Sequence, residues 1–351
     1  MPEILQNPWR GTGLPGADLL PRVDATGVAA LLRQCPAHAA TPLRDLPALA
    51  AALGVARLWL KDESARMGLG SFKALGAAHA IAQEAVATGA ADPGAALGGR
   101  VFVTASAGNH GLSVAAGARI FGARAVVYLA ETVPAAFAGR LAARGAEVVR
   151  EGTDYEASMA AAARAAAENG WTLLSDSSWP GYSDMPLRVM EGYLQLAAEA
   201  VAAMPAPPDH ILLQAGVGGL AAAVAAHARA ALGDAPQIVV VEPENARPLL
   251  ESIRAGGVVE APGAPSCMGR LDCKEPSLIA LNGLARDADL FVTISDAEAE
   301  ETAALLAGHG LPTTPSGAAG LAGLRRLDLP ADASVLVILS EGPEDQAPPV
   351  S

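Results

Sequence analysis

The chain has 351 residues, and its composition limits the classes of protein to which it can belong. Hydrophobic residues make up 51% of it and charged residues 17%, which provides a buried core and excludes a disordered chain. The formal net charge is −13, so we expect neither nucleic acid nor an anionic membrane as a partner. No apolar run has the length of a membrane span, and no signal-peptide pattern is present. We therefore expect a soluble cytoplasmic protein.

Short apolar strands alternate with helices along most of the chain. We expect residues 1–45, which are punctuated by Pro and Gly, to wrap over the surface. Beyond them, the pattern predicts a helix at 46–53, a strand at 55–61, a polar loop, and a helix that begins with Ser71 as its N-cap. The later strands are predicted at 100–104, 125–129, 147–150, 172–174, 211–214, 237–242, 290–294 and 335–339. The later helices are predicted at 112–121, 134–144, 155–168, 185–204 and 220–232.

These strands are apolar throughout, which is typical of parallel strands covered on both faces. Their alternation with helices predicts an α/β fold. No strong linker divides the chain. For this length we expect two parallel or mostly parallel sheets, with a site in the cleft between them.

Lysine is scarce in this chain. Only three of the 24 basic residues are lysines, namely Lys61, Lys73 and Lys274. Arginine cannot form an imine with an aldehyde, whereas a deprotonated lysine can. Lys73 falls on the first turn of a predicted helix, whose positive end lowers the pKa of an amine. A lysine that extends over an apolar surface is the alternative for Lys73, and chance retention is the favoured interpretation of the other two.

Three small-residue loops follow predicted strands. The first, SAGNHG at 106–111, includes Asn109, whose amide could donate a hydrogen bond to a ring oxygen. The second forms an anion nest before a helix and suits a single phosphate, because it lacks both GxGxxG and the P-loop lysine. Its residues are Gly216, Val217, Gly218, Gly219 and Leu220. The third loop is Ser340-Glu341-Gly342, in which the hydroxyl of Ser340 could face a ring nitrogen.

Each of these loops alone is compatible with an ordinary turn, but together with Lys73 they indicate one ligand. That ligand has an aldehyde, a ring oxygen, a ring nitrogen and one phosphate. Pyridoxal 5'-phosphate (PLP) has all four groups. The three cysteines (Cys35, Cys267 and Cys273) match no common zinc pattern, and we expect no metal.

The motifs KDESARMGLGSFKALGA, TASAGNHG and AGVGGLAAA resemble those of the tryptophan-synthase-like, fold type II PLP enzymes. The resemblance covers roughly residues 40 to 345. A narrower resemblance, to the diaminopropionate ammonia-lyases, lies in LLSDSSWPGYSDMPLRVMEGY, CMGRLDCKEP and LSEGPED. It implies elimination of ammonia from 2,3-diaminopropionate to give pyruvate, and a homodimer. With it we expect a large PLP-binding domain from 1–75 and 187–351, and a smaller α/β domain from 76–186.

The resemblance also assigns roles to individual residues. Lys73 matches the Schiff-base lysine, with Phe72 beside it in the cofactor site. Asn109 matches the asparagine near the phenolic oxygen, residues 216–220 match the phosphate loop, and Ser340 matches the position near the pyridine nitrogen. Asp176 matches an acid/base aspartate, and we expect burial to raise its pKa.

One position departs from the lyase pattern. The lyases usually carry an aspartate immediately before their Gly-Asn-His, and Ala107 stands there in this chain. The sequence SAGNH is also typical of serine/threonine dehydratases, so dehydration of a hydroxy-amino acid is the first alternative. A nucleotide-binding oxidoreductase is disfavoured because no GxGxxG follows an early strand. A non-catalytic protein that retains the fold is the remaining alternative.

Overall fold

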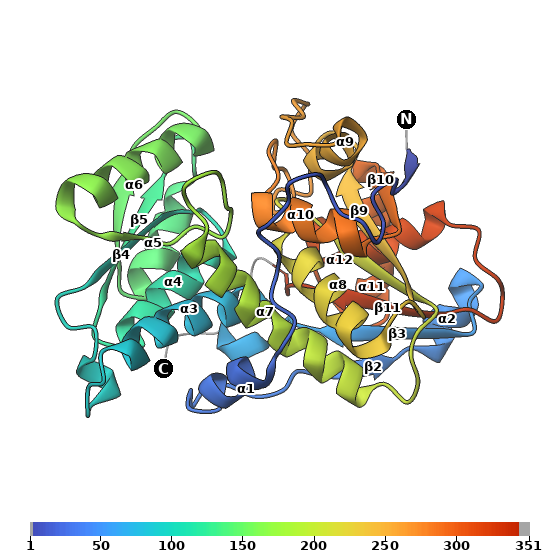
Figure 1. The fold of residues 1–351 in the computed structure, drawn as a ribbon, viewed down its shortest axis with the longest axis horizontal. Coiled ribbons are helices and arrows are strands. Elements are labelled where there is room, and N and C mark those ends of the chain that lie inside the picture. The colour runs from blue at the N-terminus through green and yellow to red at the C-terminus, as the bar shows by residue number, and fades with distance from the viewer. Residues whose placement is uncertain (1–2, 344–351) are drawn as a thin grey trace.

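The structure is a computed structural model that describes residues 3–343, and it contains two β-sheets that lie side by side (Figure 1). The larger sheet has seven strands in the order β1-β10-β9-β8-β11-β3-β2. Its two edge strands, β1 and β2, are antiparallel to their neighbours, and the five inner strands are parallel. The strands are β1 (Ile4–Gln6), β2 (Leu43–Asp45), β3 (Arg57–Asp62), β8 (His210–Gln214), β9 (Gln237–Pro243), β10 (Leu290–Ile294) and β11 (Ser334–Leu339).

The smaller sheet is parallel throughout and has the order β6-β5-β4-β7. Its strands are β4 (Val101–Ala105), β5 (Arg124–Leu129), β6 (Ala146–Arg150) and β7 (Thr172–Leu173). All four fall inside the segment expected to form the smaller domain, 76–186, while the exact domain boundaries remain a prediction. The fold class predicted from the strand pattern is confirmed.

Helices pack against both sheets, and the long helix α7 runs between the two halves of the molecule (Figure 1). The first six are α1 (Thr26–Leu32), α2 (Pro47–Leu53), α3 (Lys73–Ala87), α4 (Asn109–Ile120), α5 (Ala135–Ala143) and α6 (Tyr155–Asn169). The rest are α7 (Asp184–Ala203), α8 (Gly219–Leu232), α9 (Pro248–Ala255), α10 (Leu278–Asp287), α11 (Asp296–Gly308) and α12 (Pro315–Ala322).

Two predictions about local structure were wrong. Residues 1–45 do not simply wrap over the surface: they contain β1, α1 and β2, and the two strands close the edges of the larger sheet. Strands of three residues have too little periodicity to be recognised. The N-cap of α3 is Phe72 and not Ser71, because Ser71 pairs with Glu341 in a β-bridge. The Ser71 hydroxyl still accepts the Lys73 N–H at 3.3 Å.

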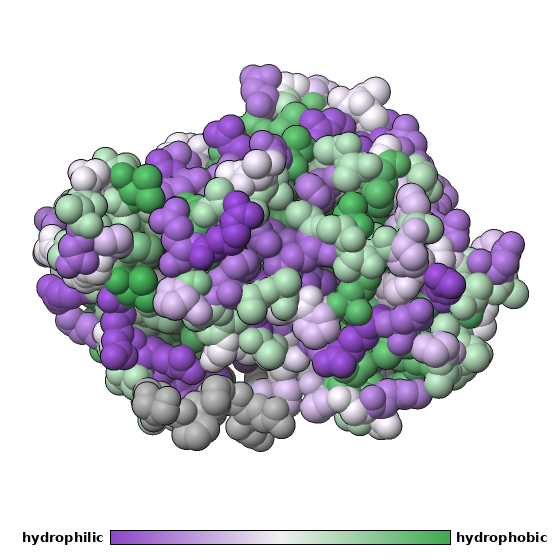
Figure 2. All heavy atoms as spheres, turned by 90° about the horizontal axis from the view of Figure 1, so that it is seen from below, coloured by the Kyte–Doolittle hydropathy of each residue, from purple (hydrophilic) through white to green (hydrophobic). Residues whose placement is uncertain are grey.

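The face of the molecule seen from below mixes hydrophobic and hydrophilic residues (Figure 2). On the face shown in Figure 2, hydrophobic residues form small patches that hydrophilic residues interrupt. Within residues 3–343, no helix combines the length and the apolar character needed to cross a bilayer.

Lys61 belongs to a buried ionic cluster, so its retention is not a matter of chance. Its ammonium lies 2.6 Å from the Glu199 carboxylate. Arg66 contacts the same carboxylate at 2.6 Å and the Glu63 carboxylate at 2.7 Å. The cluster joins β3, α7 and the turn at Arg66–Gly68, which precedes Lys73. It therefore fixes the loop that leads to the start of α3.

We expect Glu199→Gln to lower the free energy of unfolding by about 3–5 kcal/mol at pH 7, because it leaves two buried cations without their shared anion. Burial raises the pKa of Glu199, but the hydrogen bond from Arg66 and the other cationic contacts outweigh it and hold the pKa at about 2. A lowered pKa stabilises the folded state above about pH 4.3, and this contribution disappears as the pH falls toward 2. Urea unfolding between pH 3 and pH 7 measures both effects.

Glu147→Gln is the matched control, because Glu147 pairs with Arg124 on the surface, where both side chains are more than half exposed. Its expected cost is below about 1 kcal/mol. Equal costs for the two variants would contradict the assigned role of the buried cluster.

Candidate active site

Lys73 is the first residue of α3, and the backbone before it is bound to the end of β11. The Phe72 N–H donates to the carbonyl oxygen of Ser340 at 3.1 Å, and Ser71 pairs with Glu341. These backbone contacts bring Lys73 close to Ser340, although the two residues are distant along the chain. The backbone of Ser340 is fixed by this contact, and the role of its hydroxyl stays a prediction.

The Lys73 ammonium and the Asp176 carboxylate form an ion pair. Asp176 lies in the loop that follows β7, so the pair joins the two halves of the molecule. Burial alone would lower the pKa of Lys73, but the Asp176 carboxylate more than offsets it, and the pKa lies above its usual value. Burial alone would raise the pKa of Asp176, but the Lys73 ammonium keeps it below its usual value.

Both pKa expectations are therefore wrong for the protein without a ligand. The helix end was expected to lower the pKa of Lys73, and burial to raise that of Asp176. Direct contact between opposite charges is stronger than either effect. A ligand that removes the charge of one member also removes the stabilisation of the other.

The glycine loop connects β8 with α8 and is packed tightly from one side. Gly218 has a φ of +98°, and a Cβ at this position would lie 3.0 Å from the Leu249 side chain. A Cβ on Gly216 would lie 3.0 Å from the Cys273 sulfur. Within residues 3–343, no side chain caps the N-terminus of α8. Its first N–H groups and its positive end thus suit a phosphate, as the sequence predicts.

We expect Gly218→Ala to weaken PLP binding and to destabilise the protein by about 1–3 kcal/mol, because alanine is strained at this φ. The added methyl group also meets Leu249 and shifts the loop. Gly170→Ala is the control: Gly170 has a φ of +65° and no atom within 4 Å of its Cβ position. Equilibrium titration with PLP should show weaker binding only for Gly218→Ala. Equal affinities would contradict the phosphate role of the loop.

Asn109 is the first residue of α4, and its amide donates a hydrogen bond to the Glu341 carboxylate. Glu341 also accepts a hydrogen bond from the Thr314 hydroxyl at 2.5 Å and lies 3.6 Å from the Arg270 guanidinium. Because a carboxylate only accepts hydrogen bonds, this contact fixes the orientation of the Asn109 amide. The sequence-based reasoning missed Glu341, although an acidic residue directly after an apolar strand was a usable signal.

Two more residues near Lys73 were missed. Tyr193 of α7 packs its ring edgewise on Phe72, with centroids 4.9 Å apart. The Cys273 sulfur packs against Gly216 of the glycine loop, and burial, followed by the Asp176 carboxylate, raises the pKa of its thiol to about 12. A thiol that stays neutral is a poor nucleophile. Tyr193 ends the run VMEGY, in which helical spacing places Val189, Met190 and Tyr193 on one face.

A cavity of about 370 Å³ adjoins Glu341. Its lining residues are Cys267, Gly269, Arg270, Thr313, Thr314, Pro315, Ser316, Glu341 and Pro343. Among residues 3–343, no group of three or more His, Cys, Asp and Glu side chains is arranged to hold a metal ion.

Comparison with known proteins agrees with this geometry. Residues 35–341 match the model of a family described as pyridoxal-phosphate dependent enzymes. The chain belongs to this family. It is therefore a PLP-dependent enzyme, and Lys73, Asn109 and residues 216–220 all lie inside the matched region.

Three relatives illustrate the similarity. A diaminopropionate ammonia-lyase from Salmonella typhimurium is 33% identical, over 90% of this chain and 88% of its own. The crystal structure of the Escherichia coli diaminopropionate ammonia-lyase, in complex with an aminoacrylate-PLP azomethine reaction intermediate, matches with a TM-score of 0.87 and 30% identity. The match covers 97% of this chain and 94% of the chain in that crystal structure. A mouse L-serine dehydratase/L-threonine deaminase is 34% identical over 64% of this chain and 63% of its own.

Proposed function

We propose that this enzyme eliminates ammonia from 2,3-diaminopropionate, with pyruvate and a second ammonia as the final products. The observation that carries the proposal is the direct contact between Lys73 and Asp176, next to the glycine loop. The relatives named diaminopropionate ammonia-lyase, which span almost the whole chain, support it.

The residues present fit PLP. Lys73 would supply the amine that bonds to the aldehyde carbon, and Phe72 lies beside it. Residues 216–220 would hold the phosphate, Asn109 would donate to the ring oxygen, and Ser340 would lie at the ring nitrogen. When bound, PLP supplies an electron-withdrawing ring that makes the α-proton of an attached amino acid removable.

Lys73 and Asp176 then divide the proton transfers between them. Their contact lets one proton pass over a single hydrogen bond, so one group is the base while the other is the acid. The amine of Lys73, when it is not bonded to the cofactor, would remove the α-proton, and Asp176 is the second candidate for that step. The departing β-amine must gain a proton, which the protonated partner supplies. The Lys73 and Asp176 side chains are 22% and 15% exposed, which limits the access of bulk water to these transfers.

Dehydration of serine or threonine is the second candidate function, and Ala107 favours it. Ala107 is partly buried in the loop before Asn109 and provides no titratable group there. A site without this second carboxylate has fewer groups to protonate a leaving amine or to handle a D-isomer. The similarity to the mouse dehydratase also supports this candidate.

Comparison of kcat/KM for four amino acids decides between the candidates. We expect ammonia release from L-2,3-diaminopropionate to exceed that from L-serine and L-threonine by at least about 100-fold, because a site built for one leaving group rejects others by several kcal/mol. D-2,3-diaminopropionate should be the poorer isomer, because Ala107 cannot serve as its base. Preference for L-serine or L-threonine would move the function to a dehydratase.

We also propose a cytoplasmic homodimer. Two-fold dimers are the most frequent assemblies of soluble enzymes, and the resemblance to the lyases supports one here. Light scattering during gel filtration tests the dimer, which a monomeric mass would contradict.

A further inference from the structure

The hydroxyl group of Tyr193 is buried without a partner. The residue is 2% exposed, and within residues 3–343 its oxygen makes no hydrogen bond. A buried hydroxyl that lacks a partner destabilises a protein, so native structures contain few of them. Such a group near an active site is therefore a candidate contact for a ligand.

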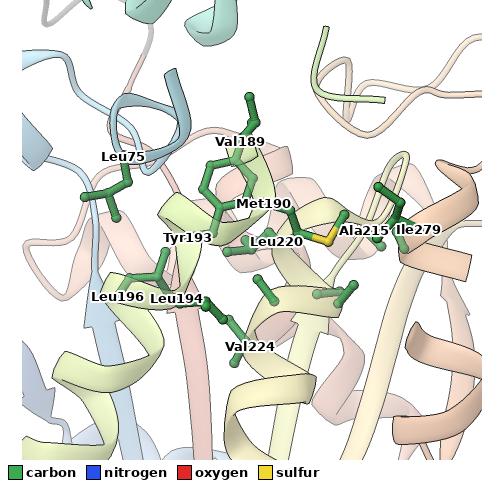
Figure 3. Close-up of a cluster of buried hydrophobic side chains, with 14 of the residues drawn as sticks. Leu75, Val189, Met190, Tyr193, Leu194, Leu196, Ala215, Leu220, Val224 and Ile279 are labelled. Carbon is green, nitrogen blue, oxygen red and sulfur yellow. The ribbon is translucent and has the colours of Figure 1, made fainter. Parts of the chain in front are cut away.

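The ring of Tyr193 lies between the first turns of two helices. A Cβ on Gly219, the first residue of α8, would lie 3.6 Å from Cε2 of the ring. A Cβ on Gly76, in the first turn of α3, would lie 2.6 Å from Cε1. Because Cε1 and Cε2 flank the carbon that bears the hydroxyl, that group projects between the two helix starts. Figure 3 shows Tyr193 in a cluster of buried hydrophobic side chains that includes Leu75 of α3 and Leu220 of α8.

This position favours a negatively charged ligand. The N-cap residues, Phe72 of α3 and Gly218 of α8, provide no side-chain cap, and the Ser71 hydroxyl is the only side-chain group that accepts a first-turn N–H of α3, so both helices present positive ends among the described residues. Lys73, the first residue of α3, lies nearby, but the Asp176 carboxylate balances its charge, so the attraction comes from the helix ends. The hydroxyl group of Tyr193 can donate a hydrogen bond to a ligand in this region.

We propose that the Tyr193 hydroxyl donates a hydrogen bond to the phosphate of PLP. It adds a side-chain donor to the backbone N–H groups of residues 216–220. The proposal rests on the placement of the phosphate at this loop, which is part of the proposed function. It explains why a tyrosine, rather than a phenylalanine, fills a site that is otherwise apolar.

The test compares PLP with pyridoxal, which has the aldehyde and the ring but no phosphate. Both are titrated into Tyr193→Phe and into the parent protein, and binding is followed by the absorbance of the bound ligand. We expect the variant to lose about tenfold to a hundredfold in affinity for PLP, the range of a hydrogen bond to a charged group. Its affinity for pyridoxal should be unchanged. Equal losses for both ligands would overturn the proposal and place the hydroxyl at the aldehyde or the ring instead.

Thermal unfolding gives a second readout that needs no turnover. Tyr193→Phe removes an unpartnered buried hydroxyl, so the ligand-free variant should melt at a higher temperature than the parent. The rise in melting temperature on adding PLP should be smaller than in the parent. A ligand-free variant that is less stable, with an unchanged response to PLP, would show that the hydroxyl has a purely structural role.

Tyr182→Phe is the matched control. The Tyr182 hydroxyl donates a hydrogen bond to the carbonyl oxygen of Leu173 at 2.8 Å and accepts one from the backbone N–H of Ser175 at 3.0 Å. Loss of this hydroxyl should therefore destabilise the ligand-free protein. The ratio of PLP to pyridoxal affinity should stay at the parent value. Gly218→Ala tests the placement of the phosphate separately from the role of Tyr193. If both Gly218→Ala and Tyr193→Phe leave the ratio of PLP to pyridoxal affinity unchanged, the phosphate does not lie at this loop. If Tyr193→Phe alone leaves the ratio unchanged, the phosphate lies there but Tyr193 does not bind it.

Discussion

Replacing Lys73 with alanine is expected to abolish turnover and the visible absorbance of bound PLP. The variant loses the amine that bonds to the cofactor and also the first candidate base. Removal of a proton-transfer group alone costs a factor of about 10²–10⁴, so we expect a loss of more than about 10³-fold in kcat. Ammonia release and an absorption spectrum of the purified variant measure the two effects.

Lys274→Arg is the control for this variant. Lys274 pairs with Asp272 at 2.5 Å, and arginine keeps that charge but cannot form an imine. It should retain both the absorbance and the turnover of the parent protein. Turnover near the parent rate in Lys73→Ala would remove this lysine from the mechanism.

Asp176→Asn is expected to lower kcat by about 10²–10⁴-fold while PLP remains bound, because asparagine keeps the shape but cannot transfer a proton. The substitution also removes the carboxylate that raises the pKa of Lys73. In the variant without PLP, the amine of Lys73 should therefore lose its proton at a lower pH, so its reaction with added PLP should begin at a lower pH. Single-turnover kinetics and a pH titration of the visible absorbance check these expectations.

Asp184→Asn serves as a comparison, since Asp184 is 73% exposed and pairs with Arg188 on the surface. We expect its kcat to stay within a factor of two or so of the parent value. An unchanged rate in Asp176→Asn would exclude Asp176 as an acid or a base.

The sequence predicted the fold class because apolar strands and helices of ordinary length carry a strong periodic signal. The prediction was poor where elements are short or flank the sheet. β1 and β2 have three residues each and exist through pairing with β10 and β3, which no local pattern reveals. The helices α9 to α12 were not anticipated, although α9 and α12 both begin with proline at their first position, a usable signal.

Most of the residues proposed for the site could be selected from the sequence because small residues follow buried strands. Lys73, Asn109 and residues 216–220 each lie directly after a strand or at a helix start. The charges of the site could not be predicted, since they depend on the contact of Lys73 with Asp176, 103 residues away. Tyr193 could not be separated from an ordinary core residue, because its orphaned hydroxyl is visible only in three dimensions.

The central claim is that Lys73 carries the cofactor, and the most direct measurement is to find the lysine to which PLP is attached. Borohydride reduction makes the bond permanent, and mass spectrometry of the digested protein locates it. Because the chain has only three lysines, the result is unambiguous. We predict the added mass on the peptide that contains Lys73. Label on Lys61 or Lys274, or on no peptide, would contradict the account.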